Sequence, residues 1–237
     1  MLAELDFGTL PVLIVGAGTV ATRKLVSMVT LPAHLKVVSP QFSPDFIASL
    51  ASLVAGCDLA ASEAISQHNW IEFSNEVQDI VFDLEGKKLE ISVRKFQEAD
   101  LHGFSVVFAA SDDVLLNGEI ARRQISKGLL VNDASSASSG NLRSVANARF
   151  AHLEVGVASL GTAPAVTRWI CGKLAEQVSP ALDRFVGLCA EVRDEARRNG
   201  IAARPGAWDS VLGSDALALL ENGDEELAIG EIRQCLL

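Results

Sequence analysis

A short apolar run that leads directly into a glycine turn is the feature that most constrains the fold. The run Leu10–Val15 (LPVLIV) is continuously apolar, which is typical of a strand buried on both faces. The turn Gly16-x-Gly18-x-x-Ala21 follows, and residues 22–29 have the pattern of a helix. The first glycine permits the tight turn, the second admits a pyrophosphate to the backbone amides, and Ala21 lets the helix pack closely. Strand, turn and helix together predict a dinucleotide site, with a purely structural turn as the alternative.

The rest of the N-terminal half alternates between strand and helix patterns. Strands are predicted over 35–38, 105–110 and 129–131, and helices over 46–54 and 113–127. Such alternation indicates parallel βαβ units in a doubly wound sheet. The stretch 60–88 fits less well and is a candidate insertion, with two strands joined around Glu85-Gly86. We therefore predict an α/β fold whose Rossmann-type domain covers residues 1–132.

The pattern of residues along the sequence changes after Asn132. A polar loop of small residues spans 133–141, and residues 152–158 alternate as a strand does. From Pro164 onward the sequence predicts helices, over 166–178, over 181–199 and again after Trp208. The C-terminal part, 166–237, is thus expected to be helical.

Composition narrows the class of protein. The chain has 237 residues and a formal net charge of −10, which disfavours general binding of nucleic acid. No apolar run approaches the roughly 18 residues that a membrane span needs, and the N-terminal run reads as a strand rather than a signal peptide. The four cysteines are scattered, so neither a zinc site nor a disulfide framework is indicated. We expect a cytoplasmic protein that contacts neither membrane nor nucleic acid.

The end of the second predicted strand lacks an expected residue. An Asp or Glu there usually binds the ribose 2′-hydroxyl of NAD, and this chain has Ser39-Pro40-Gln41 instead. NAD is the cofactor we expect, but this position leaves the choice between NAD and NADP open.

Four segments carry a resemblance to a known family. They are VLIVGAGTVATRK (12–24), VVSPQFS (37–43), FAASDDVLLN (108–117) and SLGTAPAVTRWICGKL (159–174). In these segments the chain resembles the precorrin-2 dehydrogenases and sirohydrochlorin ferrochelatases of siroheme synthesis. The motif GTAPAVTR is much more specific than the glycine turn, and the likeness covers nearly the whole chain apart from 60–88 and the C-terminus.

The resemblance implies a homodimer with an NAD domain, a dimerisation region over 133–165 and a helical C-terminal region. It implies NAD-dependent oxidation of an anionic tetrapyrrole, precorrin-2, to sirohydrochlorin, and in some members insertion of ferrous iron; cobaltous ion is a second candidate metal. Carried over by position, the residues expected at the cofactor are Gly16, Gly18, Thr19, Val20, Pro40, Gln41, Asp112 and Asn117. Ser159 matches a position near the substrate entrance, and Arg168 and Lys173 are candidate partners for substrate carboxylates.

One departure from the family pattern affects the expected catalytic residue. The family places an Asp, which acts as base and helps chelation, two residues after an Asn, whereas here Asn132 is followed at once by Asp133 and an ungapped alignment puts Ser135 at the Asp position. Either Asp133 serves as base and metal ligand, or the chemistry is altered or lost. A non-redox chelatase, carrier or partner subunit is therefore the alternative function, and an unrelated oxidoreductase is a third.

Several of these residues also have a structural explanation. Asp133 can open a polar loop by an Asx turn, and Asp113 can be a helix N-cap. Arg168 and Lys173 can belong to a solvated helix face. The segment Ser159–Pro164 can be a turn in which Thr162 caps a helix that Pro164 begins.

Overall fold

The computed structural model describes residues 4–28, 30–68, 78–136, 138–159, 161–202 and 205–237. The chain forms two compact units, divided between Ser144 and Val145. Each unit is described by itself below.

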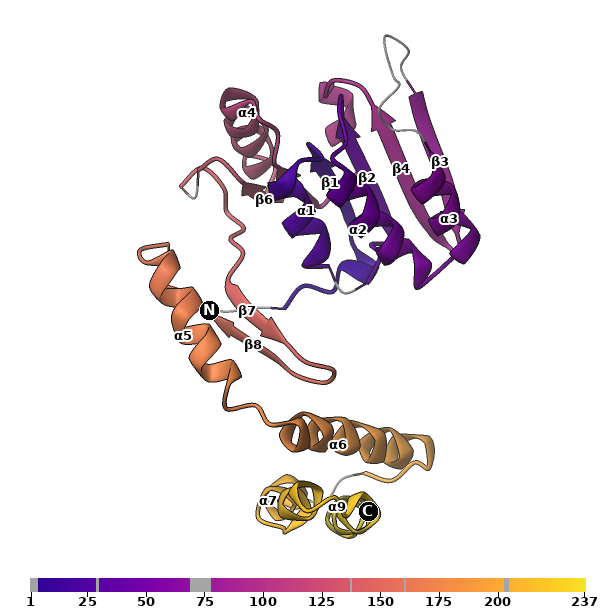
Figure 1. Ribbon diagram of the computed structural model, residues 1–237, viewed down its shortest axis with the longest axis vertical. Coiled ribbons are helices and arrows are strands. Elements are labelled where there is room, and N and C mark those ends of the chain that lie inside the picture. The colour runs from indigo at the N-terminus through magenta and orange to yellow at the C-terminus, as the bar shows by residue number, and fades with distance from the viewer. Residues whose placement is uncertain (1–3, 29, 69–77, 137, 160, 203–204) are drawn as a thin grey trace. The chain divides into compact units, whose positions relative to one another are not determined.

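The first unit contains a six-stranded sheet in the order β3-β4-β2-β1-β5-β6 (Figure 1). Its strands are β1 (Pro11–Val15), β2 (His34–Ser39), β3 (Gln78–Leu84), β4 (Lys87–Val93), β5 (Val106–Ala109) and β6 (Leu130–Asp133). All neighbours pair in parallel except β3, which is antiparallel to β4 at the edge. This arrangement confirms the predicted Rossmann-type α/β fold.

Helices cover both faces of the sheet, and the alternation of side chains along β1 explains why. Val12 and Ile14 belong to the core that includes α1 and α2, whereas Leu13 and Val15 belong to the core that includes α4. A parallel strand between two helical layers must be apolar on both faces, as the run LPVLIV is. The helices of this unit are η1 (Phe7–Thr9), α1 (Thr19–Val26), α2 (Pro44–Ala55), α3 (Leu59–Gln67), η2 (Glu98–Leu101) and α4 (Val114–Ile125).

Two predicted helix starts can be compared with the structure. Helix α1 begins at Thr19, three residues before the predicted Thr22, because Gly18 is already its N-cap. Asp113 is the N-cap of α4, and its carboxylate accepts a hydrogen bond from the amide of Leu116 at 3.0 Å. The capping role predicted for Asp113 is therefore confirmed.

Over its described residues, the stretch 60–88 forms most of helix α3 and strand β3. The predicted pair of strands is present, as β3 and β4 joined by Glu85 and Gly86, both with positive φ, as in a two-residue hairpin turn. However, β4 pairs in parallel with β2 and is an integral strand of the sheet. Helix α3 packs on α2, and β3 is the edge strand of the sheet. Residues 69–77 lie outside the described part.

The second unit combines a hairpin with helices. Its elements are β7 (Ala146–Arg149), β8 (Glu154–Val157), α5 (Pro164–Ala175), α6 (Pro180–Arg198), α7 (Ala207–Leu212), α8 (Ala216–Glu221) and α9 (Glu225–Leu236). Helix α5 packs on the hairpin, while α6 to α9 enclose their own core around Leu188 and Ile232. Strand β7 was not predicted. No helix in the described ranges is both long and apolar enough for a membrane span.

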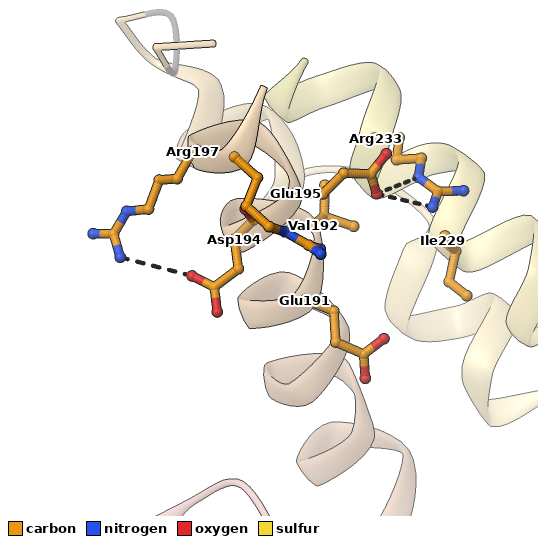
Figure 2. A pocket seen from close by; sticks show the side chains of 8 residues that line it. Glu191, Val192, Asp194, Glu195, Arg197, Ile229 and Arg233 are labelled. Atoms are coloured by element: carbon orange, nitrogen blue, oxygen red, sulfur yellow. Dashed lines mark hydrogen bonds and ion pairs between the residues drawn. The ribbon is translucent and has the colours of Figure 1, made fainter. Parts of the chain in front are cut away.

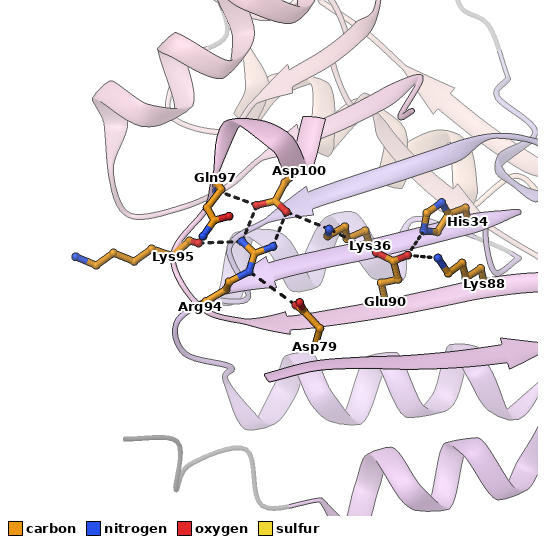
Figure 3. Close-up of polar contacts among 9 residues, drawn as sticks. All are labelled: His34, Lys36, Asp79, Lys88, Glu90, Arg94, Lys95, Gln97 and Asp100. Atoms are coloured by element: carbon orange, nitrogen blue, oxygen red, sulfur yellow. Dashed lines mark hydrogen bonds and ion pairs between the residues drawn. The ribbon is translucent and has the colours of Figure 1, made fainter. Parts of the chain in front are cut away.

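A buried ion-pair network lies across β2, β4 and η2 (Figure 3). Asp100 is 3% exposed, and its carboxylate accepts two hydrogen bonds from Arg94, at 2.6 and 2.8 Å, and one from the amide of Gln97 at 2.8 Å. Lys36 lies 3.0 Å from Asp100 and 3.5 Å from Glu90, its register partner on β4. Burial alone would raise the pKa of Asp100, but the hydrogen bonds from Arg94, Gln97 and Lys36 outweigh it and lower the pKa to about 2.

The network makes stability depend on pH in a defined direction. Because the pKa of Asp100 falls from 3.8 to about 2 on folding, its contribution is complete above pH 4 and is lost as the pH falls from about 4 to about 2. Asp100→Asn should lower the free energy of unfolding at pH 7 by about 2 kcal/mol or more. The difference from wild type should shrink on acidification, as measured by urea unfolding between pH 7 and pH 3. Asp79→Asn, which removes a half-exposed carboxylate 3.8 Å from Arg94, should cost little; a deficit in Asp100→Asn that does not change with pH would contradict the assignment.

Candidate dinucleotide site

The site predicted from the glycine turn lies where the strand order reverses. Strand β1 pairs with β2 on one side and with β5 on the other, so the chain winds outward in both directions from this pair. Ligands of open α/β sheets bind at the carboxyl ends of the strands at such a point. Here the edge is formed by the glycine turn after β1 and by the loops that follow β2, β5 and β6.

The fold of the protein, rather than a ligand, requires glycine at position 16. Its φ is +102°, and a Cβ built on it would lie 2.3 Å from the carbonyl oxygen of Ala110, just past the end of β5. Its amide donates to the carbonyl of Val38 at 2.9 Å. The turn after β1 therefore touches the ends of both neighbouring strands, and only glycine fits there.

The fold of the protein does not require glycine at position 18. Its φ is −92°, which any residue adopts, and a Cβ built on it would meet no atom within 4 Å. It is also the N-cap of α1 and supplies no side-chain hydrogen bond. In the described part of this unit, α2, α3 and α4 are all capped by side chains, from Ser43, Asp58 and Asp113.

Helix α1 thus presents uncapped amides to open space. The first amides of a helix have no partner within it and carry the positive end of its dipole. Thr19 and Val20 form this first turn, and Val20 is exposed. Gly18, Thr19 and Val20 fit a pyrophosphate. The space beside Gly18, which a side chain would fill if residue 18 were not glycine, is open to the phosphates.

The loop after β2 borders the turn. Pro40 and Gln41 are exposed, whereas Ser39 is buried and its hydroxyl donates to the carbonyl of Gln41 at 2.5 Å. The amide of Ser43 donates to the carbonyl of Ala17 at 3.0 Å and holds this loop against the glycine turn. Pro40 and Gln41, the two residues predicted to flank the ribose, therefore lie at the edge of the pyrophosphate cradle, which is the glycine turn together with the first amides of α1.

Asn117, predicted at the cofactor, is fully buried and braces the loop after β5. Its Oδ1 accepts from the amide and the hydroxyl of Ser111, at 3.1 and 2.7 Å, and its Nδ2 donates to the Ser111 carbonyl at 2.8 Å. Asp112, the next residue, is exposed. Asn117 therefore acts on the site through Ser111, whereas Asp112 faces solvent.

Asp133 closes the loop after β6. Its side chain is 5% exposed; Oδ1 accepts from the amide and the hydroxyl of Ser135 at 2.8 and 2.5 Å and from the amide of Ser136 at 3.2 Å, and Oδ2 accepts from the hydroxyl of Ser139. Burial alone would raise the pKa of Asp133, but the hydrogen bonds from Ser135, Ser139 and Ser136 together hold it below its ordinary value. Asp133 thus lies in a built Asx turn, and a carboxylate that receives these hydrogen bonds is a weaker base than a free one.

The two predicted catalytic residues are in contact with each other and with Asn117. The hydroxyl of Ser135 lies 2.5 Å from Asp133 Oδ1 and 3.5 Å from Asn117 Nδ2. One chain of hydrogen bonds therefore joins the loops after β5 and β6. The sequence analysis missed Ser111 and Ser139 as parts of this chain; a serine directly after a buried strand and the serine repeats of the loop were the available signals.

Ser159 and Thr167 organise the start of α5 in the second unit. Ser159 Oγ accepts from the amide of Ala163 at 3.1 Å and lies 2.7 Å from the hydroxyl of Thr167, which is buried. Pro164 is the first residue of the helix as predicted, but Ala163 rather than Thr162 is the N-cap. The hydroxyl of Thr162 instead donates to the carbonyl of Ser159 at 2.7 Å.

Arg168 and Lys173, on α5, differ in their surroundings. Both are exposed. Lys173 pairs with Glu176 at 2.8 Å on the same helix, as on a solvated face. Arg168 has no ion pair within the part of the chain that the structure describes, so its guanidinium is available to an anion.

A groove between α6 and α9 is lined by none of the predicted site residues (Figure 2). Its lining residues are Glu191, Val192, Asp194, Glu195, Arg197, Arg198, Ile229 and Arg233. Their charges are largely paired, Arg233 with Glu195 at 2.9 Å and Arg197 with Asp194 at 3.7 Å. Over the described residues, no three His, Cys, Asp or Glu side chains gather as a metal site would require, and the four cysteines are free thiols.

Comparison with known proteins supports the assignment of the glycine turn to a dinucleotide-binding domain. Residues 4–146 match the model of a protein family described as "Putative NAD(P)-binding". The chain belongs to this family. The match spans every element of the sheet, and it confirms that the strand, glycine turn and helix belong to an NAD(P)-binding domain.

Curated relatives carry the comparison beyond that domain. The chain is 28% identical over 224 residues to "Siroheme synthase" of Chromobacterium violaceum, covering 94% of this chain and 40% of that protein. It is 30% identical over 233 residues to "Siroheme synthase 2" of Aeromonas hydrophila, with the same two shares. The chain therefore spans about two fifths of the length of these relatives.

A solved structure shares the fold over almost the whole length. It is described as "SirC, precorrin-2 dehydrogenase", superposes with a TM-score of 0.67, and is covered to 99%, as is this chain, at 21% identity. At this identity the likeness shows the fold alone. The shared fold includes the hairpin and the C-terminal helices as well as the sheet.

The two glycines should respond differently to substitution. Gly16→Ala forces a Cβ against the Ala110 carbonyl at positive φ and should lower the free energy of unfolding by about 2 kcal/mol or more. A Cβ at position 18 meets no protein atom within 4 Å, so Gly18→Val should cost at most about 1 kcal/mol as a changed N-cap.

The same pair separates stability from binding. Saturating NAD should raise the melting temperature of the wild type, since a hundredfold excess over Kd contributes about 2.7 kcal/mol. Gly18→Val should abolish that rise, because its side chain occupies the pyrophosphate position. A melting curve of the wild type that neither NAD nor NADP moves would refute the site.

Proposed function

We propose that the protein is an NAD-dependent dehydrogenase that oxidises precorrin-2 to sirohydrochlorin in siroheme biosynthesis. The observation that carries the proposal is the uncapped start of α1 beside Gly18, in a chain that aligns over 94% of its length with siroheme synthases. The cradle supports use of a dinucleotide, and the relatives support the substrate.

Different residues at the carboxyl edge of the sheet bind different parts of the dinucleotide. The amides at Gly18, Thr19 and Val20 hold the pyrophosphate, and Pro40 and Gln41 contact a ribose. Bound NAD supplies the hydride acceptor. The bracing of Ser111 by Asn117 and of the β6 loop by Asp133 fixes the floor of the site before any ligand arrives.

Asp133 can act as a base or as an anchor of its loop. Its several hydrogen bonds and lowered pKa favour the anchor, so water takes the proton that leaves with the hydride. Ser135 donates its hydroxyl to Asp133, a carboxylate whose lowered pKa makes it a weak base for activating that hydroxyl. We propose that both residues position the loop.

Substrate recognition requires cations, because the tetrapyrrole carries several carboxylates and the chain has a net charge of −10. Arg168 meets this need best, since it is exposed and unpaired by any described residue, whereas Lys173 is shared with Glu176. A guanidinium binds a carboxylate through two parallel hydrogen bonds.

A spectrophotometric assay with precorrin-2 tests the proposal. NAD-dependent formation of sirohydrochlorin is the expected result. Reactions with ferrous or cobaltous ion, with and without NAD, separate metal insertion from oxidation; turnover that needs metal but not NAD would support a chelatase instead, and no turnover in any arm would refute the proposal.

Asp133→Asn in this assay distinguishes the two roles of that residue. An anchor should lose stability, because Oδ1 or Oδ2 becomes an amide that cannot accept from Ser135 or Ser139. Turnover per folded molecule should stay within about threefold of wild type. A loss of a hundredfold or more, as removal of a general base causes, would show that Asp133 takes the proton. Ser135→Ala is the matched variant, and it should behave alike.

We also propose that the protein is a homodimer, with the β7–β8 hairpin and α5 at the interface. A hairpin of two strands is marginal alone. One face of α5 packs on it through buried Thr167 and Cys171. Next to this buried side, α5 exposes apolar side chains with helical spacing, Val166, Trp169, Ile170 and Leu174. Such a patch is typical of a protein interface.

Trp169→Glu should convert the dimer to a monomer, because it replaces the most exposed apolar side chain of this set, 65% exposed, with a charge. Sedimentation velocity at tens of micromolar measures the change. Trp208→Glu, on α7, is the matched control and should leave the dimer intact. A wild-type protein that sediments as a monomer would contradict the proposal.

A further inference from the structure

Two adjacent apolar side chains at the start of α4 are open to solvent. Leu115 is 84% exposed and Val114 is 60% exposed, whereas the next residue, Leu116, packs against the core on the α4 side of the sheet. A single exposed leucine needs no explanation, but two neighbouring apolar side chains at the edge of a ligand site do. The free protein gains nothing from this apolar surface, so we looked for a ligand that covers it.

The backbone that carries Val114 and Leu115 is held in place on both sides. Asp113 caps the helix, and its carboxylate accepts from an amide of the first turn at 3.0 Å. Asn117, fully buried, forms three hydrogen bonds with Ser111, at 2.7, 2.8 and 3.1 Å. Side chains on a helix lean toward its N-terminus. Because α4 follows β5, its N-terminus lies at the carboxyl edge of the sheet, and the two apolar side chains lean toward that edge.

This part of the carboxyl edge is where the nicotinamide half of a dinucleotide belongs. In Rossmann-type sheets the loop after β2 contacts the adenosine ribose, and the pyrophosphate lies at the first turn of α1. The nicotinamide half then falls on the opposite side of β1, over the ends of β5 and β6. A substrate that gives up a hydride must lie against the nicotinamide. It therefore lies beside the loops after β5 and β6 and the start of α4.

The chemistry of this segment suits the ring system of such a substrate better than its carboxylates. Between Ala110 and Gly118 the chain has no lysine or arginine, and the exposed Asp112 repels an anionic group. Apolar side chains, in contrast, gain free energy when a flat, carbon-rich surface covers them. A tetrapyrrole has such a surface in its macrocycle and carries its carboxylates at the periphery. Those carboxylates are left to cations elsewhere, such as Arg168.

From this geometry we infer that Val114 and Leu115 form a contact surface for the tetrapyrrole macrocycle and hold it beside the nicotinamide. The inference rests on the function proposed above, and it adds a substrate-binding role separate from the binding of the dinucleotide. The two side chains then contribute to the affinity for the tetrapyrrole and not to the affinity for NAD.

Leu115→Ser tests this role, and it should leave the fold intact because the side chain is 84% exposed. The KM for precorrin-2 should rise by about tenfold or more, because the covered apolar surface is lost. The Kd for sirohydrochlorin, measured by absorbance titration without turnover, should rise by a similar factor. The Kd for NAD, measured by calorimetry, should stay within about twofold, since backbone amides of α1 hold the dinucleotide. Leu115→Met, which keeps the apolar surface, should bring KM and the sirohydrochlorin Kd back near the wild-type values.

Leu59→Ser is the matched control and should change none of these values. Leu59 is 66% exposed and directly follows the aspartate that caps α3, as Val114 follows Asp113, but α3 begins after the far end of α2, away from the carboxyl edge. A Leu115→Ser variant with wild-type KM and wild-type Kd for sirohydrochlorin would overturn the inference and leave the dehydrogenase standing. A variant that sediments as a smaller species than the wild type would assign Leu115 to a subunit interface and overturn it too. If the wild type neither oxidises precorrin-2 nor binds sirohydrochlorin, the proposed function falls with the inference.

Discussion

The approach of Gly16 to the carbonyl of Ala110 is the constraint on which the carboxyl edge of the sheet depends. It brings the turn after β1 into contact with the residue that follows β5, while the Gly16 amide donates to the carbonyl of Val38 in β2. Three strand ends therefore meet at one backbone position that has no room for a side chain. The direction in which α1 leaves the sheet, and so the direction of its first amides, follows from this contact.

The other loops at this edge are stabilised by their own side chains. Asn117 holds Ser111, Asp133 holds the segment through Ser139, and Ser39 closes on Gln41. Such local bonds satisfy the backbone where no strand or helix can. They also leave few polar groups free, so the chemistry of this edge falls to backbone amides and to a small number of exposed side chains.

The sequence predicted the parts of the fold that depend on local pattern, and failed where distant contacts decide. The buried strands, the glycine turn and the Asp113 cap follow from residues next to one another. Strand β7 (ANAR) alternates only two small alanines with polar residues, which is a weak local signal, and it is held by pairing with β8 and packing against α5. The integral role of β4 depends on its pairing with β2, some fifty residues earlier. Likewise, the serines of the loop after Asp133 do not indicate which of them returns to bind it, and in the structure Ser139 does so.

The missing cap of α1 makes this the least self-sufficient helix of the sheet domain. It has eight residues, and its first turn has neither a side-chain acceptor nor acidic residues to balance the dipole. A serine or aspartate at Gly18 would stabilise the free protein, but its side chain would fill the place meant for a phosphate. The amides of α1 are consequently the ones whose protection against hydrogen exchange depends most on a bound anion, so that the ligand completes a secondary structure element that the chain leaves unfinished.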